Sequence, residues 1–328
     1  FHPNQSVLLH RQADNVWRID FQLGWGADPE TEKKPENVIP RIKAMLGDDR
    51  AFELEWVSVY TFQCRRMNRF NHGRVLFVGD AAHQVSPFGA RGANSGIQDA
   101  DNLVWKLKLV MDGKAPATLL DSYTDERGFA ADENIMNSTR STDFITPKSA
   151  VSKTFRNAVL DLAEHHPFAR ALVNSGRLSV PSFLVESRLN TPDGDDFGGS
   201  MVPGAPMDDA PVAAPRGGSP WLLGHLGDGF RVLYYVDDAD GLPPATAQAL
   251  AALADGPIPV EALVVAARGT APGGLTTLLD THARIKARYD LEPGTTYLAR
   301  PDQHVAARWR KLDAAAIRAA LARATCNA

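Results

Sequence analysis

The sequence predicts a mixed α/β protein, and two regions indicate this class. In residues 73–109, an apolar run is followed by a Gly-Asp pair, a glycine-rich stretch and a helical pattern. This order is typical of a strand, a turn, a loop and a helix. Beyond residue 219, apolar runs alternate with helical patterns, as in a small α/β domain. The 328 residues, 44% of them hydrophobic, are enough for about two domains.

Composition and charge exclude several functions. The net charge is −4 and the basic residues are scattered, which argues against nucleic acid as a main partner. The sequence has no run of ~18 apolar residues, so we expect no membrane span. Cys64 and Cys326 are isolated and show no metal-ligand spacing. We therefore expect no metal site and a reduced, cytoplasmic setting.

A hairpin and a helix are predicted near the start of the chain. Strand patterns at 5–10 and 16–23 are separated by a polar turn. Apolar residues recur at helical spacing over 38–46, and this helix should end at Gly47. Pro40 fits such a helix only in its first turn.

A third strand is expected over 52–62, and it brings Trp56, Tyr60 and Phe62 to one face. Aromatic residues in such a strand are either plain core or the wall of a flat apolar pocket, and both interpretations stay open. Arg65 follows near the next strand end. Most such arginines lie on the surface or in ion pairs, and contact with a nucleotide phosphate is the alternative.

The central region combines an acid with a flexible loop. Residues 74–78 form a continuous apolar run, typical of a strand buried on both faces. Gly79 and Asp80 end this run and leave a carboxylate where open α/β sheets place their ligands. Glycines that let a bound group approach the backbone follow at 89, 92 and 96.

The helix after this loop is predicted to open at 95–97, where Ser95 and Gln98 fit a capping box. It should end at Gly113. Its buried face should consist of Ile97, Ala100, Val104, Leu107 and Met111. The free N–H groups at its start favour a negative charge. Together with the acid, they suggest a cofactor that carries both hydroxyl groups and a delocalised negative charge.

Three other polar residues in this region receive structural interpretations. Asp99 and Asp101 suit the dipole of the helix and need no catalytic role. No partner acid is evident for His83, so we favour a structural hydrogen bond over a role as a base.

The remainder of the chain divides at an irregular stretch. Helices are predicted at 116–137, 155–164 and 167–173. Residues 191–218 are rich in Pro, Gly and Asp, which indicates a linker or a wrapping loop. The last domain should have strands at 230–236, 258–266 and 295–299 and helices at 243–253, 278–289 and 314–324.

An array of motif residues resembles the FAD-dependent aromatic hydroxylases, which are single-component flavoprotein monooxygenases. The array consists of Gly79-Asp80-Ala81-Ala82-His83, Pro87, Gly89, Gly92, Asn94, Gly96, Asp99, Asn102-Leu103 and Trp105-Lys106-Leu107. Residues 297–306 look like the thioredoxin-like C-terminal domain of the phenol hydroxylase and 3-(3-hydroxyphenyl)propionate hydroxylase branches. The redox cysteines of thioredoxin are absent from this sequence, so we expect a structural domain.

The resemblance implies a function and a set of cofactors. The expected reaction is hydroxylation of a phenolic substrate with O2 and NADPH or NADH through a flavin C4a-hydroperoxide, with FAD as the cofactor. The resemblance assigns Asp80 to the ribityl chain of FAD. It assigns the rest of the FAD site to Gly79, Pro87, Gly89, Gly92, Ala93 and Asn94. Trp56, Tyr60 and Phe62 become candidates for the substrate pocket, and Arg65 becomes one for NAD(P)H.

The resemblance also implies a division into domains. Residues 1–63 correspond to the end of an antiparallel substrate-domain sheet, and 64–190 to the C-terminal part of a Rossmann-like FAD-binding domain with a helical extension. A linker at 191–218 and a thioredoxin-like domain at 219–328 complete the chain. The N-terminal GxGxxG motif of the family and its middle Asp-Gly motif are missing, so we expect an N-terminally truncated piece.

Alternatives remain at this point. The chain is otherwise a non-catalytic module whose residues 221–328 make homodimer contacts, or a flavin enzyme for epoxidation or Baeyer–Villiger chemistry, because the loop recognises cofactor and not substrate. Arg91 is expected close to the flavin, where it either pairs with a phosphate or draws in the hydride donor. The residues do not decide between these roles.

Overall fold

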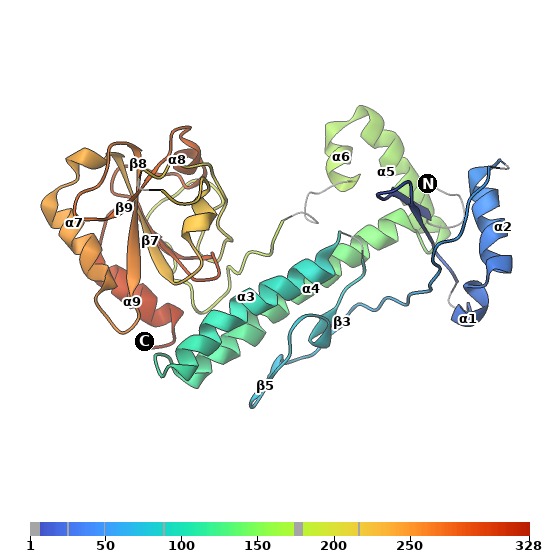
Figure 1. Ribbon diagram of the computed structural model, residues 1–328, viewed down its shortest axis with the longest axis horizontal. Coiled ribbons are helices and arrows are strands. Elements are labelled where there is room, and N and C mark those ends of the chain that lie inside the picture. Colours follow the sequence, from blue (N-terminus) through green and yellow to red (C-terminus); the bar gives the residue numbers. More distant parts are fainter. Residues whose placement is uncertain (1–6, 25, 49, 88, 174–179, 216) are drawn as a thin grey trace. The chain divides into compact units, whose positions relative to one another are not determined.

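A computed structural model of the chain describes residues 7–24, 26–48, 50–87, 89–173, 180–215 and 217–328 (Figure 1). The chain forms two compact units. One consists of Phe1–Cys64, Val85–Gly89 and Met136–Leu178, and the other of Arg65–Gln84, Ala90–Ile135 and Ser179–Ala328. The predicted mixed α/β class is confirmed. No helix in the described ranges has the length and apolar character needed to cross a membrane.

The predicted hairpin opens the first unit. Strands β1 (Val7–Arg11) and β2 (Trp17–Phe21) pair antiparallel, with Val7 opposite Phe21. Asp14 and Asn15 have positive φ angles of 53° and 60° in the turn, a conformation that tight hairpin turns require.

The predicted first helix is also confirmed, after a short helix α1 (Pro29–Glu32). Helix α2 (Pro35–Leu46) ends at Gly47, which has a left-handed φ of 70°. Pro40 lies inside α2 and not in its first turn, so the helix lacks one backbone donor there.

The strand predicted at 52–62 is wrong, because none of these residues forms a hydrogen-bonded strand. A strand needs a neighbour to receive its backbone hydrogen bonds, and β1 and β2 pair only with each other. The aromatic side chains still lie beside one another. The ring centroids of Trp56 and Tyr60 are 6.2 Å apart, as are those of Tyr60 and Phe62.

Three helices cover most of the predicted helical regions between 116 and 173, although the first begins only at Asp121. Helix α4 (Asp121–Ile145) begins in the second unit and ends in the first. Helices α5 (Ala150–His165) and α6 (Pro167–Val173) belong to the first unit. Ser149 caps α5, because its Oγ accepts a hydrogen bond from the backbone N–H of Ser152 at 3.1 Å.

Short strands surround the Gly-Asp pair in the second unit. They are β3 (Arg65–Arg66), β4 (Asn71–His72), β5 (Val75–Leu76) and β6 (His83–Gln84). Strand β3 pairs with β6, and β4 pairs with β5. The expected buried strand at 74–78 is therefore wrong: only two of its residues form a strand, β4 is its neighbour, and Val75 is exposed.

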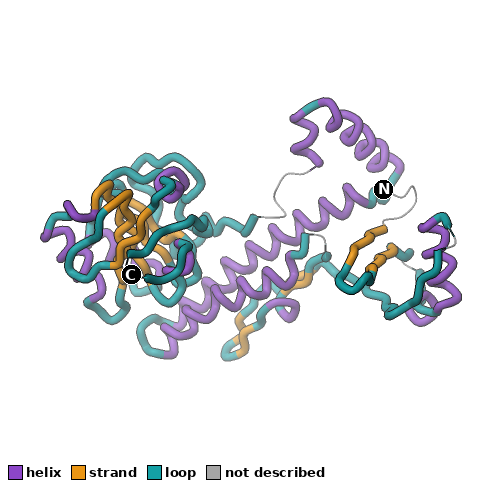
Figure 2. Tube along the Cα trace, turned by 45° about the horizontal axis from the view of Figure 1, so that its top comes forward, coloured by secondary structure: helices purple, strands orange, loops and turns teal. Residues whose placement is uncertain are grey.

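A five-stranded sheet forms the centre of the C-terminal region, drawn in orange in Figure 2. The strands are β7 (Phe230–Asp238), β8 (Val260–Arg268), β9 (Thr276–Leu279), β10 (Thr296–Ala299) and β11 (Val305–Trp309). Their order is β11-β10-β7-β8-β9, in which β7, β8 and β9 are parallel and the other pairs are antiparallel. The helices are α7 (Pro244–Ala251), α8 (Arg284–Arg288) and α9 (Ala314–Ala324).

The sheet has a hydrophobic core on each face. Val232 and Tyr234 of β7 belong to one core, and the alternating Leu233 and Tyr235 belong to the other. Residues 191–218 contain no helix or strand among those described, and Met201, Ala205 and Met207 pack into the second core. This stretch therefore fits the predicted wrapping loop.

Most predicted elements of the C-terminal region are confirmed, but the helix at 278–289 is wrong in its first half. The first two residues of the predicted helix belong to β9, which ends at Leu279, and the helix itself covers only Arg284–Arg288. Asp280 starts this helix, because its carboxylate accepts hydrogen bonds from the N–H groups of Arg284 and Lys286, both at 2.8 Å.

Candidate functional site

The Gly-Asp pair forms a single tight turn, η1 (Gly79–Ala81), in the second unit. Gly79 has a φ of +58°, a conformation that a side chain would strain. A Cβ atom on Gly96 would lie 3.4 Å from the Cα atom of Gly79. Gly79 therefore suits this turn through its backbone conformation, the turn packs against a helix at Gly96, and the Asp80 side chain is exposed.

That helix is α3 (Arg91–Met111), and it begins earlier than the predicted 95–97. Arg91, Gly92 and Ala93 are the first three residues of α3, so their N–H groups have no acceptor within the helix. The residue before the helix provides no side-chain cap. The sequence predicted that free N–H groups at the start of this helix favour an anion. Two of the residues that carry them, Gly92 and Ala93, are residues that the family resemblance assigns to FAD.

The predicted capping box is wrong. Ser95 lies inside α3 and is buried. Its Oγ accepts hydrogen bonds from Nη2 of Arg127 and Nδ2 of Asn134, both at 3.2 Å. Ser95 thus joins α3 to α4, which lies alongside it (Figures 1 and 2).

The face of α3 that was predicted to be buried is also wrong. Ile97, Val104 and Met111 are 69%, 61% and 77% exposed. The buried side is largely polar and contains Arg91, Ser95, Asp99, Asn102 and Lys106, together with Leu103 and Trp105. Apolar periodicity fails here because α3 is buried through hydrogen bonds and ion pairs.

Asp99 is the centre of the first of two buried ion clusters. Its Oδ2 accepts a hydrogen bond from the backbone N–H of Gly79 at 3.0 Å and lies 2.7 Å from Nε2 of His83. Its Oδ1 accepts one from Nε of Arg127 at 2.6 Å. We call Asp99, His83 and Arg127 the Asp99 cluster. All three side chains are at most 3% exposed.

The Asp99 cluster confirms the structural hydrogen bond predicted for His83 and adds to two of the sequence interpretations. Asp99 does more than suit the helix dipole, and it is the partner acid that was not evident for His83. Burial alone would raise the pKa of Asp99, but the hydrogen bond from His83 and the charge of Arg127 outweigh it and lower that pKa. An ionised Asp99 thus holds the Gly79 turn. In the sequence, the place of Asp99 in the motif array was the signal for this residue.

The two arginines left open by the sequence lie in different surroundings. Arg91 is buried and donates hydrogen bonds to Oδ1 of Asn134 and, at 3.1 Å, to the carbonyl of Val180. Burial lowers its pKa, and Glu133 opposes this effect. Arg65 is exposed, and its Nε donates to Gln84 at 2.9 Å.

Several predicted site residues belong to the first unit. Pro87 and Gly89 are exposed. Trp56, Tyr60 and Phe62 are exposed by 71%, 57% and 54%. These three do not line the cavity described next.

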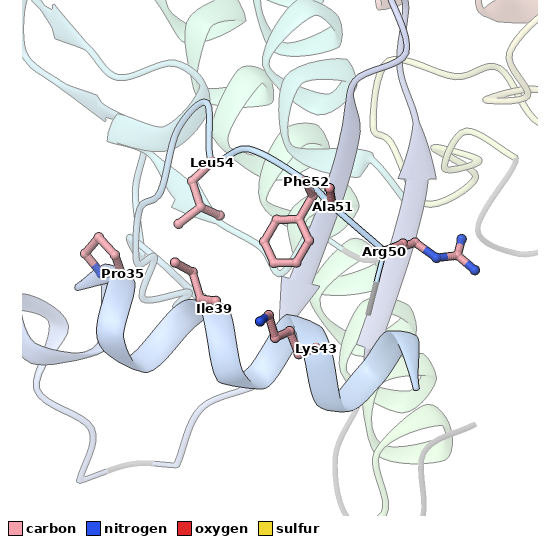
Figure 3. A pocket seen from close by; sticks show the side chains of 7 residues that line it. All are labelled: Pro35, Ile39, Lys43, Arg50, Ala51, Phe52 and Leu54. Atoms are coloured by element: carbon pink, nitrogen blue, oxygen red, sulfur yellow. The ribbon is translucent and has the colours of Figure 1, made fainter. Parts of the chain in front are cut away.

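This cavity has a volume of about 520 Å³ and lies between α2 and residues 50–54 (Figure 3). Ile39, Phe52 and Leu54 point toward one another across it, while Arg50 points away and pairs with Asp48 at 2.5 Å. The remaining lining residues are Pro35, Lys43 and Ala51. Because the lining has no convergent polar groups apart from Lys43, we assign it no ligand.

Comparison with known proteins identifies the region that contains the turn and the start of α3. Residues 6–138 match the family described as FAD binding domain. This segment is thus similar to an FAD binding domain. The resemblance to FAD-dependent aromatic hydroxylases, predicted from the array around Gly79 and Asp80, is therefore confirmed.

Two curated relatives have sequences similar to the FAD-binding segment and its surroundings. The probable NADH-specific resorcinol 4-hydroxylase of Rhodococcus jostii is 44% identical over 125 residues, which are 38% of this chain and 23% of that protein. The 3-(3-hydroxy-phenyl)propionate/3-hydroxycinnamic acid hydroxylase of Escherichia coli is 32% identical over 197 residues, or 60% of this chain and 33% of the relative. The chain thus matches a third or less of each relative's length.

A solved structure shares the fold. Aklavinone-11 hydroxylase, in a ternary complex with FAD and aklavinone, superimposes with a TM-score of 0.70 at 22% identity. The match covers 99% of this chain and 58% of the hydroxylase. The family match and the NADH-specific relative agree with the predicted cofactors, FAD and a nicotinamide.

Proposed function

We propose that the protein containing this chain is an FAD-dependent monooxygenase that hydroxylates a phenolic substrate with NADPH or NADH and O2. The observation that carries this proposal is the Gly79-Asp80 turn packed against the uncapped start of α3 in an FAD-binding segment. The printed activities of the two curated relatives support the reaction class and point to resorcinol and 3-(3-hydroxyphenyl)propionate as first substrates to test.

The residues present fit the proposed cofactor. The exposed carboxylate of Asp80 can accept hydrogen bonds from ribityl hydroxyl groups. The N–H groups of Gly92 and Ala93 can stabilise the negative charge of a reduced flavin without reorganising, and Asn94 would lie beside them. When bound, FAD supplies the transfer of electrons from the nicotinamide and the activation of oxygen. The chain's own part is to bind the isoalloxazine edge and to keep the turn in place.

The remaining site assignments are part of the same proposal. Pro87 and Gly89 would line the flavin ring, and exposed Arg65 would meet a phosphate of NAD(P)H. The adjacent, exposed rings of Trp56, Tyr60 and Phe62 would contribute a flat apolar wall to the substrate pocket. Homodimer formation and a cytoplasmic location are also proposed, and the latter rests on the two isolated cysteines.

The test begins with the intact protein purified and examined for a visible flavin spectrum. NAD(P)H oxidation is then measured with a panel of phenols, and incorporation of oxygen from labelled O2 is followed in the product. We expect bound flavin, phenol-stimulated oxidation and one labelled oxygen per product. Absence of flavin from the folded protein would contradict the proposal, and flavin reduction that yields only peroxide with every phenol would contradict hydroxylation.

Replacement of Asp80 tests the proposed ribityl contact. Asp80→Ala should raise the Kd for FAD by about tenfold or more, because a hydrogen bond to a charged group contributes about 1.5–3 kcal/mol. Asp228→Ala is the matched control, since Asp228 is 85% exposed and lies in the sheet domain. Fluorescence titration of the apoprotein with FAD measures both. An unchanged Kd in Asp80→Ala would refute the assignment.

A further inference from the structure

Helix α3 joins the candidate FAD site to the C-terminal sheet within the second unit. Its first turn provides the N–H groups of the proposed site. Its later residue Trp105 belongs to the same core as Phe230 and Val232 of β7. The rings of Trp105 and Phe230 meet edge to face, with centroids 5.6 Å apart. A shift of the sheet domain would therefore move α3.

A second buried ion cluster ties the sheet domain to both helices. Arg300, which follows β10, donates from Nη1 and Nη2 to the two carboxylate oxygens of Glu126 in α4, at 2.6 and 2.9 Å. It also donates to both carboxylate oxygens of Asp302, at 2.9 and 2.5 Å. Nζ of Lys106 in α3 donates to Glu126 at 2.7 Å. We call these four residues the Glu126 cluster. Their side chains are at most 1% exposed.

The two clusters occupy neighbouring positions on the same helices. Glu126 directly precedes Arg127, which donates to Asp99. Asn102 lies three residues after Asp99, on the same face of α3, and its Nδ2 donates to Glu126 at 2.7 Å and to Asp302 at 2.9 Å. On α4, Arg127 of the Asp99 cluster thus follows a residue that contacts Arg300 of the sheet domain. On α3, Asp99 lies one turn before a residue that contacts Asp302 of the same domain.

This arrangement restricts how α3 and α4 can move. Buried charges stay where their partners satisfy them, because any displacement leaves a desolvated charge uncompensated. The bidentate contact of Arg300 with Glu126 also fixes direction, since the guanidinium fork and the carboxylate are planar. A displacement of Glu126 along or around α4 would carry Arg127 with it and thus disturb Asp99 and the N–H of Gly79.

We propose that Arg300 is a positioning residue for the FAD site. Through Glu126, it holds α3 and α4 in the register in which Asp99 keeps the Gly79-Asp80 turn against the start of α3. The C-terminal domain, which lacks a cysteine pair in this sequence, thus braces the flavin site. This inference rests on the proposed function, since it assumes that FAD binds at this turn.

A double-mutant cycle on the intact protein tests the inference. The variants are Arg300→Lys, Asp99→Asn and their combination, and the readouts are the Kd for FAD and the thermal unfolding midpoint. Arg268→Met is the matched control, because Arg268 forms an exposed ion pair with Asp238 in the same domain. Arg300→Lys keeps the charge but loses the bidentate fork. It should raise the Kd by about threefold or more at a temperature where the variant is folded.

The coupling separates positioning from stability alone. In the Asp99→Asn background, Arg300→Lys should change the Kd by less than half of its effect in the wild type, because the path to the turn is already broken. Arg268→Met should leave the Kd unchanged in both backgrounds. A lower unfolding midpoint with an unchanged Kd in Arg300→Lys would overturn the inference, and so would independent, multiplying effects of the two substitutions.

The outcomes also separate this inference from the proposed function. A folded wild-type protein that binds no FAD would overturn both. Wild-type binding with an unaffected Arg300→Lys variant would overturn only the positioning role. If Arg300→Lys does not fold, Asp302→Asn replaces it in the cycle with the same expected results, because Asp302 fixes the other side of the guanidinium.

Discussion

The two ion clusters at α3 and α4 both consist of buried carboxylates and basic side chains, but they have different partners. The Asp99 cluster contacts the Gly79-Asp80 turn, and the Glu126 cluster contacts the sheet domain. The Asp99 cluster ends on a backbone N–H group, that of Gly79, and so acts on a turn with an exposed acid. In the Glu126 cluster, two carboxylates and two cations pair with one another across three segments of the chain, and none of them contacts the Gly79-Asp80 turn in the contacts described above. The comparison separates a contact that shapes a site from contacts that hold the fold together, although both lie on the same helices.

Removal of Glu126 should give the largest loss of stability. Glu126→Ala leaves Lys106 and Arg300 buried without their shared partner, so we expect the free energy of unfolding to fall by about 3–5 kcal/mol. Urea denaturation measures this, with Asp228→Ala as the exposed control. A loss below about 1 kcal/mol would mean that the Glu126 cluster does not hold the domain to the helices.

Removal of the charge of Asp99 should affect stability less and the cofactor more. Asp99→Asn keeps a side-chain acceptor for the Gly79 N–H but breaks the ion pair with Arg127. We expect a loss of about 1–3 kcal/mol in urea denaturation, within the range for a hydrogen bond to a charged group. FAD should be retained poorly in gel filtration. If Asp99→Asn lost as much stability as Glu126→Ala and still retained FAD, the Asp99 cluster would hold the fold and would not shape the FAD site.

Acid should weaken both clusters, through groups whose pKa is lowered by folding. Burial would raise the pKa of Glu126, but the charges of Arg300 and Lys106 outweigh it and hold that pKa below its usual 4.5. Below pH 4.5 the unfolded chain therefore binds more protons than the folded chain, so the free energy of unfolding falls as the pH falls. Glu126→Gln should reduce this slope in denaturation experiments between about pH 6 and pH 3. An unchanged slope would show that other acids dominate.

The sequence predicted those helices and strands whose periodicity and end residues lie within the element itself. The hairpin of β1 and β2, the end of α2 at Gly47, strand β7 and helix α9 lie where periodicity and end signals indicate. The strand expected at 52–62 failed because pairing depends on a neighbour that the pattern cannot supply.

The interior of the candidate site was much less predictable. The Gly79-Asp80 turn and the residues of the first turn of α3 follow from the motif, but their support does not. The apolar stripe at Ile97 and Val104 predicted a buried face, whereas the described structure buries charges paired across 20–174 residues. Such pairs leave no periodic signal, because each charged residue alone resembles one on a solvated helix face.

The central claim is that FAD binds at the Gly79-Asp80 turn and the start of α3. A crystal structure of the intact protein with FAD tests it most directly. We predict hydrogen bonds between the Asp80 carboxylate and the ribityl hydroxyl groups, and between the flavin pyrimidine edge and the N–H groups of Gly92 and Ala93. Flavin bound elsewhere, with Asp80 in solvent, would contradict the account.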